Sequence, residues 1–231
     1  MILPFLISVP HAGIQVPPEI NELNQLGPEH IIEDGDQGAR EIYDIRNDVT
    51  AFVTTQIARA FIDVNRAETD LSPDGIVKTE TIYKIPVYKK PLTQEQINDL
   101  IKRYYQPYHQ KLTELAPGVI LGIDCHTMAA QAPPICPDAG RERPLICLSN
   151  DDRTCSREWL HLMADCLADS FQCRVRLNEP FRGGFIIKSH ASELPWLQLE
   201  LSRHDFLSRQ EKKLKILTAF KNWWSQIGAA K

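Results

Sequence analysis

The sequence lacks the patterns that identify several common classes of enzyme and binding protein. It contains no HExxH pair, no Walker-type glycine loop and no GxGxxG or GxSxG sequence, which removes several widespread enzyme classes. It also lacks a basic excess, because 26 Lys and Arg residues face 30 Asp and Glu residues. Nucleic acid is therefore not an expected partner.

Long apolar runs and paired cysteines are absent as well. No run approaches the roughly 20 apolar residues that span a bilayer, and the segment MILPFLISVP lacks the basic region and cleavage site of a secretory leader. We therefore expect a soluble protein without a membrane partner. The six cysteines form no CxxC pair, so we interpret them as free thiols in a reducing cytoplasm.

Apolar runs and helical stretches alternate along the 231 residues, an order typical of an α/β sheet. We predict a single domain, residues 1–231, with a mixed, mostly parallel sheet flanked by helices and an irregular arm or lid at about 70–92. Thr93 to Gln96 has the form of a capping box and predicts a helix of about 20 residues ending near Ala116. The predicted strands are 2–9, 60–64, 144–148, 174–178, 184–188, 196–201 and the run ending at His126; the other predicted helices are 39–60, 156–171 and 207–225, and 129–143 is a predicted loop.

Two apolar runs end on histidines. The segment GVILGIDCHTM, residues 118–128, stops on Asp124 and His126, and the run Ile2–Val9 is followed by His11. Such groups are costly to bury unless something satisfies them, and ligands of open α/β sheets bind beyond the carboxyl ends of the strands. We therefore interpret both histidines as parts of one site. The same rule selects Asn65, Arg66 and Glu200.

Two histidines do not complete a catalytic zinc site, which usually has three protein ligands and an open position. The acidic cluster from Glu33 to Asp36 follows His11 and offers a carboxylate, although such a cluster also suits a helix N-terminus. His30 and Glu33 form an HxxE pair that also occurs in zinc sites. The residues alone leave these choices open.

Glu200 and Arg66 each have two interpretations. Glu200 lies between two leucines, so in a strand it points to the opposite face, either to solvent or into the site as a general base. Arg66 either pairs with Asp63 or Asp70, or takes a substrate carboxylate in a bidentate grip.

Seven segments of the chain form a recognisable series. They are SVPHAG at 8–13, DGDQGAREIYD at 34–44, DVNR at 63–66, RYYQPYH at 103–109, GIDCHTM at 122–128, FRGGFI at 181–186 and LQLELSR at 197–203. In this order they resemble the N-formylglutamate amidohydrolase family, and DVNR also looks like an element of the aspartoacylase and succinylglutamate desuccinylase enzymes. The resemblance implies a zinc carboxypeptidase-like (phosphorylase/hydrolase-like) fold.

The resemblance also implies roles for individual residues. One Zn²⁺ per chain would be held by His11, His126 and a carboxylate that matches Asp36, with Asp34 as the alternative. Glu200 matches the general base, and Asp124 is interpreted as a group that orients an imidazole. The residues implied in substrate binding are Asn65, Arg66, Arg182, Gly183, Gly184 and His190.

We therefore expect a zinc-dependent hydrolase that cleaves the amide bond of an N-formyl or N-acyl acidic amino acid, with Glu200 and Arg66 as catalytic residues. Its expected partner is a small anionic N-acyl amino acid. Two alternatives remain at this point: a carboxypeptidase-like or cell-wall peptide amidase, and a non-catalytic module that binds a metabolite. The sequence makes no prediction of the oligomeric state.

Overall fold

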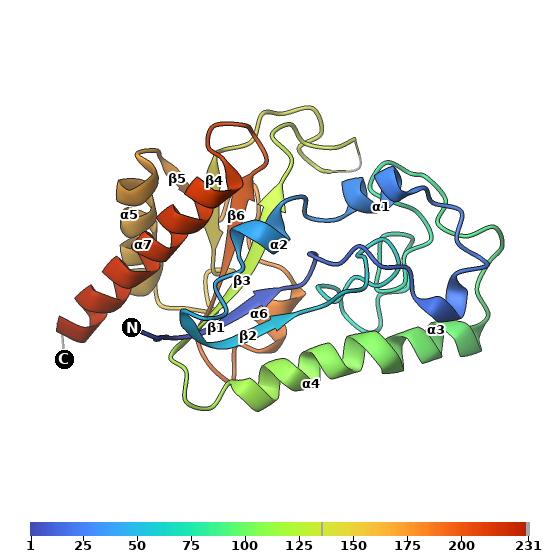
Figure 1. Cartoon of the computed structure of the whole chain (residues 1–231), viewed down its shortest axis with the longest axis horizontal. Coiled ribbons are helices and arrows are strands. Elements are labelled where there is room, and N and C mark those ends of the chain that lie inside the picture. Colours follow the sequence, from blue (N-terminus) through green and yellow to red (C-terminus); the bar gives the residue numbers. More distant parts are fainter. Residues whose placement is uncertain (135, 230–231) are drawn as a thin grey trace.

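A computed structural model describes residues 1–134 and 136–229 of the chain. The described residues form one six-stranded sheet in the order β2-β1-β3-β6-β4-β5 (Figure 1). Neighbouring strands are parallel except for β4 and β6, which are antiparallel. The predicted mixed, mostly parallel α/β sheet is confirmed. The strands are β1 (Leu3–Val9), β2 (Val49–Thr54), β3 (Leu121–Met128), β4 (Ile146–Ser149), β5 (Val175–Leu177) and β6 (Trp196–Ser202).

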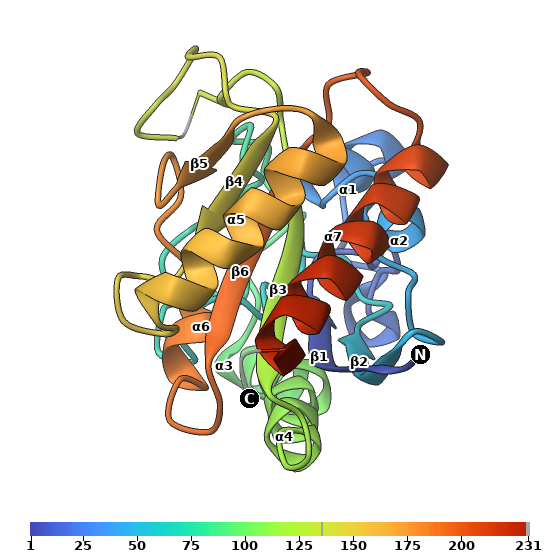
Figure 2. The ribbon, with the colours of Figure 1, turned by 90° about the vertical axis from the view of Figure 1, so that its left-hand side faces the viewer.

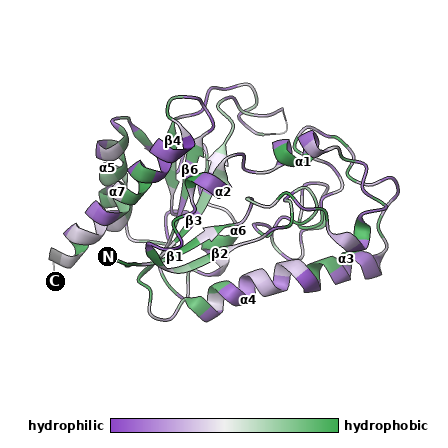
Figure 3. Cartoon of the chain, viewed as in Figure 1, coloured by the Kyte–Doolittle hydropathy of each residue, from purple (hydrophilic) through white to green (hydrophobic). Residues whose placement is uncertain are grey.

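Helices lie on both faces of the sheet (Figures 1 and 2). Three of them, α2 (Ala39–Ile42), α5 (Arg157–Phe171) and α7 (Arg209–Ala229), pack on one face, and α4 (Gln106–Leu115) and α6 (Phe185–Ser189) pack on the other. Two apolar clusters fill the two interfaces. In Figure 3 the strands are mostly green, whereas the helices carry both colours, as expected for helices that cover a buried sheet.

The remaining helices extend from the sheet toward the right of Figure 1. They are η1 (Pro18–Ile20), α1 (Pro28–Asp34) and α3 (Gln94–Leu100). The capping box at Thr93 is present, and the helix it opens continues through the π-helical turn Ile101–Tyr105 into α4, as predicted. The π turn lies just before Pro107, which has no amide hydrogen for a normal helical bond.

Two predictions between residues 39 and 64 were wrong. The helix predicted over 39–60 ends at Ile42, and β2 begins at Val49. The residues of β2, VTAFVT, are mostly β-branched or aromatic and alternate between buried and more exposed positions, which favours a strand beside β1. The strand predicted over 60–64 is instead a mixture of turns and irregular backbone. The amides of Phe61 and Ile62 bond to the carbonyl of Ala58, and that of Asp63 bonds to Ile76 of the arm.

The extended segment predicted over 184–188 was also wrong, because residues 185–189 form the helix α6. Its apolar residues Ile186 and Ile187 are buried against the sheet, and a short apolar run does not reveal whether it is a strand or a helix.

Residues 70–92 are irregular and contain isolated bridges, Glu80 with Pro86 and Tyr88 with Asn24. Several side chains of this arm are nevertheless buried, among them Ile76, Lys78 and Val87. Within the described parts of the chain, no helix is both long enough and apolar enough to cross a membrane.

Candidate metal centre

The candidate site lies where the order of strands reverses. Strand β1 is flanked by β2 on one side and β3 on the other, so the connections leave the carboxyl ends of β1 and β3 in different directions. Such a point is the usual binding crevice of an open α/β sheet. His11 follows β1, His126 lies near the end of β3, and Glu200 of β6 is the register partner of His126.

Alternation along the strands aims the polar residues at one face. Leu199 and Leu201 belong to the apolar cluster under α5 and α7, so Glu200 between them faces the opposite layer. Asp124 and His126 lie two residues apart and are in register with Gln198 and Glu200. One face of the central strands is therefore apolar except for Thr127, and the other becomes polar at its carboxyl end.

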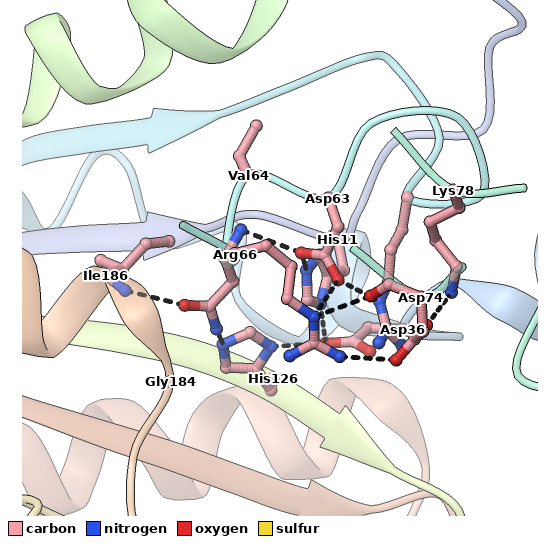
Figure 4. A network of polar contacts seen from close by, with 12 residues as sticks. His11, Asp36, Asp63, Val64, Arg66, Asp74, Lys78, His126, Gly184 and Ile186 are labelled. Carbon is pink, nitrogen blue, oxygen red and sulfur yellow. Dashed lines mark hydrogen bonds and ion pairs between the residues drawn. The ribbon is translucent and has the colours of Figure 1, made fainter. Parts of the chain in front are cut away.

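Three buried side chains converge at this end (Figure 4). Nδ1 of His126 lies 2.9 Å from Oδ2 of Asp36, and Nδ1 of His11 lies 3.6 Å from the same oxygen. One ligand atom from each of the three residues lies within 4.8 Å of the others. Two imidazole nitrogens and one carboxylate oxygen are the donor types of many catalytic zinc sites.

The other nitrogen of each imidazole faces a buried carboxylate. Nε2 of His11 is 2.8 Å from Oδ1 of Asp63, and Nε2 of His126 is 2.8 Å from Oδ2 of Asp124. If each Nε2 donates its proton to that carboxylate, each Nδ1 has a free lone pair directed toward Asp36. Histidines that bind metal are commonly held in this way, so the residues present fit a metal ion.

Electrostatics keep Asp36 ionised. Burial alone raises the pKa of Asp36, but the charges of His11 and His126 and their hydrogen bonds outweigh it and hold the pKa well below its usual range. Burial likewise lowers the pKa of His126, but Asp124 and Asp36 outweigh it and hold that pKa well above its usual range. The negative charge of Asp36 and Asp124 favours a cation at this position. A metal ion that binds there would displace the proton between His126 and Asp36.

Glu200 is 5% exposed and accepts a hydrogen bond from Nε2 of Gln198 at 2.9 Å. Burial raises the pKa of Glu200 to about 7; His126 opposes the shift and Asp36 adds to it. A carboxyl group with a pKa near neutrality is suited to accept and return a proton.

A cavity of about 340 Å³ opens over these groups. Arg203 is one of the residues that line it; its Nη2 donates to the carbonyl of Gly35 at 2.6 Å and lies 3.4 Å from Oδ1 of Asp36. The arginine thus fixes the segment that carries Asp36. The arginines that line the cavity are Arg59, Arg66, Arg143, Arg182 and Arg203.

The turn from Asp63 to Arg66 presents two predicted substrate residues to the cavity. The side chain of Asn65 accepts a hydrogen bond from the amide of Ile186 at 2.8 Å and donates to Asp124 at 3.3 Å. Arg66 donates from Nε to the carbonyl of Asp74 and from Nη2 to its carboxylate at 2.7 Å. Asp74 of the arm is therefore its main partner. Of the two predicted partners, Asp63 lies 3.8 Å from Nε of Arg66, whereas Asp74 takes the place predicted for Asp70.

The segment Arg182–Gly184 lines the same cavity. Gly183 has φ of 120°, a conformation that favours glycine, and a Cβ on Gly184 would lie 2.3 Å from Nδ2 of Asn65. Gly184 is therefore needed for the close approach to Asn65, and Gly183 for the conformation of the turn. Arg182 pairs with Asp152, and its side chain is 66% exposed.

Four residues considered from sequence lie elsewhere. His190 does not line the cavity, and its ring contacts His109 and Glu193. Asp34 is fully buried against Lys78, 3.0 Å from its Nζ, and is not in the converging group. His30 and Glu33 lie on α1, outside the cavity lining.

Sequence reasoning missed several residues of the site. Asp63 lies in the DVNR motif and Arg203 at the end of LQLELSR, so both residues could have been predicted from those motifs. Arg143 lies on the loop 129–143, outside every motif, so no pattern in the sequence pointed to it. Its guanidinium pairs with Asp138 and stacks over the ring of Phe181.

Known proteins resemble this chain over most of its length. The sequence model of the N-formylglutamate amidohydrolase family matches residues 3–207. An N-formylglutamate deformylase of Pseudomonas putida is 23% identical over 226 residues, covering 90% of this chain and 84% of that protein.

Two solved structures have the same fold. An N-formylglutamate amidohydrolase from Ralstonia eutropha JMP134 has a TM-score of 0.78 at 21% identity, covering 98% of this chain and 95% of that chain. A gene product of Agrobacterium tumefaciens has a TM-score of 0.75 at 16% identity, covering 99% of this chain and 90% of that chain.

Proposed function

Because the chain belongs to the N-formylglutamate amidohydrolase family, we propose that it hydrolyses the amide bond of an N-formyl or N-acyl acidic amino acid with the help of one zinc ion. The family match and the curated relative support an N-formylglutamate amidohydrolase-type hydrolase. The observation that carries the finer proposal is the buried group of His11, Asp36 and His126 with Glu200 beside it in one arginine-lined cavity.

His11, Asp36 and His126 are the residues that would hold the ion, through Nδ1 of each imidazole and a carboxylate oxygen. A zinc ion bound there would supply Lewis-acid chemistry, polarising the amide carbonyl and making water more acidic. Asp63 and Asp124 orient the two imidazoles. Arg203 offsets the charge of Asp36 and fixes its segment.

Glu200 is the proposed general base and acid. Its carboxylate would accept a proton from the attacking water and return it to the leaving amine nitrogen, so that it ends the cycle ionised as it began. Burial raises its pKa to about 7, which suits both transfers near neutral pH.

The cavity supports a small anionic substrate. Its volume of about 340 Å³ is at the lower end of the range for small-molecule sites. Arg66 is the proposed carboxylate-binding residue, and its guanidinium would be shared between the substrate and Asp74. Arg182 at the rim and the backbone of Gly183 and Gly184 border the same space.

The decisive experiment measures metal content together with hydrolysis. The purified protein should contain about one equivalent of zinc, and release of free amine should be followed across a panel of N-formyl, N-acetyl and longer N-acyl amino acids. We expect acidic amino acids to be preferred. Cleavage of muropeptides alone would favour a peptide amidase, and ligand binding without hydrolysis or zinc would favour a binding module.

The role of Glu200 is tested by Glu200→Gln, which keeps the shape of the side chain and removes the base. Turnover should fall roughly 100- to 10,000-fold while zinc remains bound. Glu158→Gln is the matched control, because Glu158 lies exposed on α5. Full turnover of Glu200→Gln with zinc retained would reject the assignment.

A further inference from the structure

A second pair of histidines lies outside the cavity lining and takes no part in the proposed reaction. Nδ1 of His109, on α4, lies 2.9 Å from Nε2 of His190, which follows α6. His190 is 5% exposed. Neither residue lines the cavity.

The contacts of this pair determine how many protons it holds. Nε2 of His109 is 2.9 Å from the carbonyl oxygen of Val64, and Nδ1 of His190 is 2.9 Å from Oε2 of Glu193. Together with the bond between the rings, these are three contacts that each need one proton. Two neutral imidazoles supply only two, because each carries one N–H. The group of His109, His190 and Glu193 therefore holds one extra proton.

The surroundings favour His190 as the site of that proton. Glu193 lies against His190 and also accepts a hydrogen bond from Oγ1 of Thr113 at 2.8 Å. Burial and the neighbouring charge of His190 lower the pKa of His109 to about 4, although Asp124 and Glu68 oppose the shift. His109 is therefore neutral, and its Nδ1 accepts the proton of His190.

The pair reaches the substrate residues through the backbone. His109 donates to the carbonyl of Val64, and Tyr105, one helical turn earlier, donates from its hydroxyl to the carbonyl of Arg66 at 2.9 Å. These two bonds fix the backbone on both sides of Asn65. One face of a single helix thus holds the turn that presents Asn65 and Arg66 to the cavity.

The helix α6 holds the same turn at a second point (Figure 4). The amide of Ile186 donates to the side chain of Asn65 at 2.8 Å, and the amide of His190 donates to the carbonyl of Ile186 at 3.1 Å. A displacement of His190 would therefore move Asn65 through α6 and Val64 through His109.

We propose that His109 and His190 are positioning residues, and that the extra proton they share with Glu193 keeps Asn65 and Arg66 aligned to bind the substrate. When this proton is lost, two lone pairs face each other at one of the three contacts. That hydrogen bond is then broken, and the turn that carries Asn65 and Arg66 is held less firmly. This inference rests on the proposed function for its kinetic consequences, but the proton count does not.

The first test needs no substrate. In ¹⁵N NMR spectra of the whole protein at pH 7, both ring nitrogens of His190 should carry a proton, and His109 should carry one on Nε2 only. His190→Gln and His109→Gln identify the signals. Two neutral rings with a single proton each at pH 7 would overturn the proposal, whatever the protein hydrolyses.

The second test is kinetic. His190→Gln should raise KM about 5- to 20-fold while kcat changes less than about threefold; such a change in KM corresponds to about 1–1.8 kcal/mol. Zinc content should stay constant, because Asp63, which contacts His11, is held separately by Arg59. His161→Gln, an exposed residue of α5, is the matched control. An unchanged KM, or a loss of zinc, would contradict a positioning role.

Glu193→Gln separates the charge from the shape of the group. The amide still accepts a hydrogen bond from His190, but without the carboxylate the extra proton is held less tightly. In the ¹⁵N spectrum of the variant at pH 7, a smaller share of His190 should carry two protons, and KM should rise. An unchanged KM would show that no proton of this group controls binding.

Discussion

Two pairs of histidines contact the same turn, Asp63–Arg66, and they use their nitrogen atoms differently. In the pair His11 and His126, the rings lie 4.9 Å apart and each points one nitrogen at a shared carboxylate, that of Asp36. In the pair His109 and His190, one ring bonds directly to the other at 2.9 Å. In the first arrangement the Nδ1 lone pairs can bind a cation, whereas in the second the Nδ1 lone pair of His109 accepts a hydrogen bond from His190.

The difference teaches that the partner of each nitrogen decides the role of a buried histidine. Asp63 and Asp124 can accept the Nε2 protons of the first pair, so that each Nδ1 offers a lone pair once a metal ion has displaced the proton that His126 shares with Asp36. In the second pair, the carbonyl of Val64 takes one proton and Glu193 another, and the remaining contact needs a third. Metal is therefore expected at the first pair and an extra proton at the second.

The largest effect should come from breaking the first pair. His126→Ala should reduce bound zinc to well below one equivalent and turnover on the order of 1,000-fold or more, because the Lewis acid contributes several kcal/mol to the transition state. His190→Gln should keep zinc. Elemental analysis of both variants checks the contrast, and equal zinc loss in the two would abolish the distinction.

The next largest effect concerns zinc affinity, which should depend on Asp124, the carboxylate that contacts His126, but not on Glu193, the carboxylate that contacts His190. Asp124→Asn removes the charge that holds the proton on Nε2 of His126, so zinc affinity should fall about 10- to 100-fold. Glu193→Gln, a comparable change behind the second pair, should leave zinc affinity unchanged. Competition with a chelator measures both. A normal affinity in Asp124→Asn would mean that Asp124 does not orient the imidazole.

The sequence predicted the first pair well and the second poorly, for a physical reason. His11 and His126 follow apolar strands, and the carboxyl ends of parallel strands meet at one edge, so their proximity was predictable. His109 lies inside a helix and His190 after a short one that was predicted as extended. Nothing in the local pattern indicates that residues 81 positions apart share a proton.

The errors in the fold have the same origin. The apolar segments 60–64 and 184–188 were predicted as strands, but short apolar runs are equally compatible with buried turns or helices. Their true conformation depends on the sheet against which they pack. Arg143 and Asp74 were missed because a long loop and an irregular arm carry them into the cavity.

The second pair should also affect how stability depends on pH. Folding keeps the pKa of His109 at about 4, below its ordinary value of 6.5. The unfolded chain therefore takes up a proton below pH 6.5 that the folded protein refuses until about pH 4, so stability falls as the pH decreases through this window. For this group the loss between pH 8 and pH 5 is about 2 kcal/mol.

Urea unfolding at the two pH values measures this loss in the wild-type protein and in His109→Gln. The glutamine does not titrate, so the variant should lose about 2 kcal/mol less than the wild type over the same interval. His161→Gln should behave like the wild type, because His161 is exposed on α5. Identical losses in wild type and His109→Gln would mean that His109 is protonated in the folded protein.

The smallest expected effect is a decrease in KM, whereas substitutions in the second histidine pair should increase KM. Asp74→Asn keeps the backbone carbonyl and an amide oxygen for Arg66 but removes a carboxylate that competes with the substrate for the guanidinium. Its side chain is 28% exposed, so we expect KM to fall only about two- to fivefold, as for a partly screened ion pair. Lys78 keeps Asp34 as a partner. If KM rises instead, Asp74 orients Arg66 as the second histidine pair orients the turn, and does not compete with the substrate.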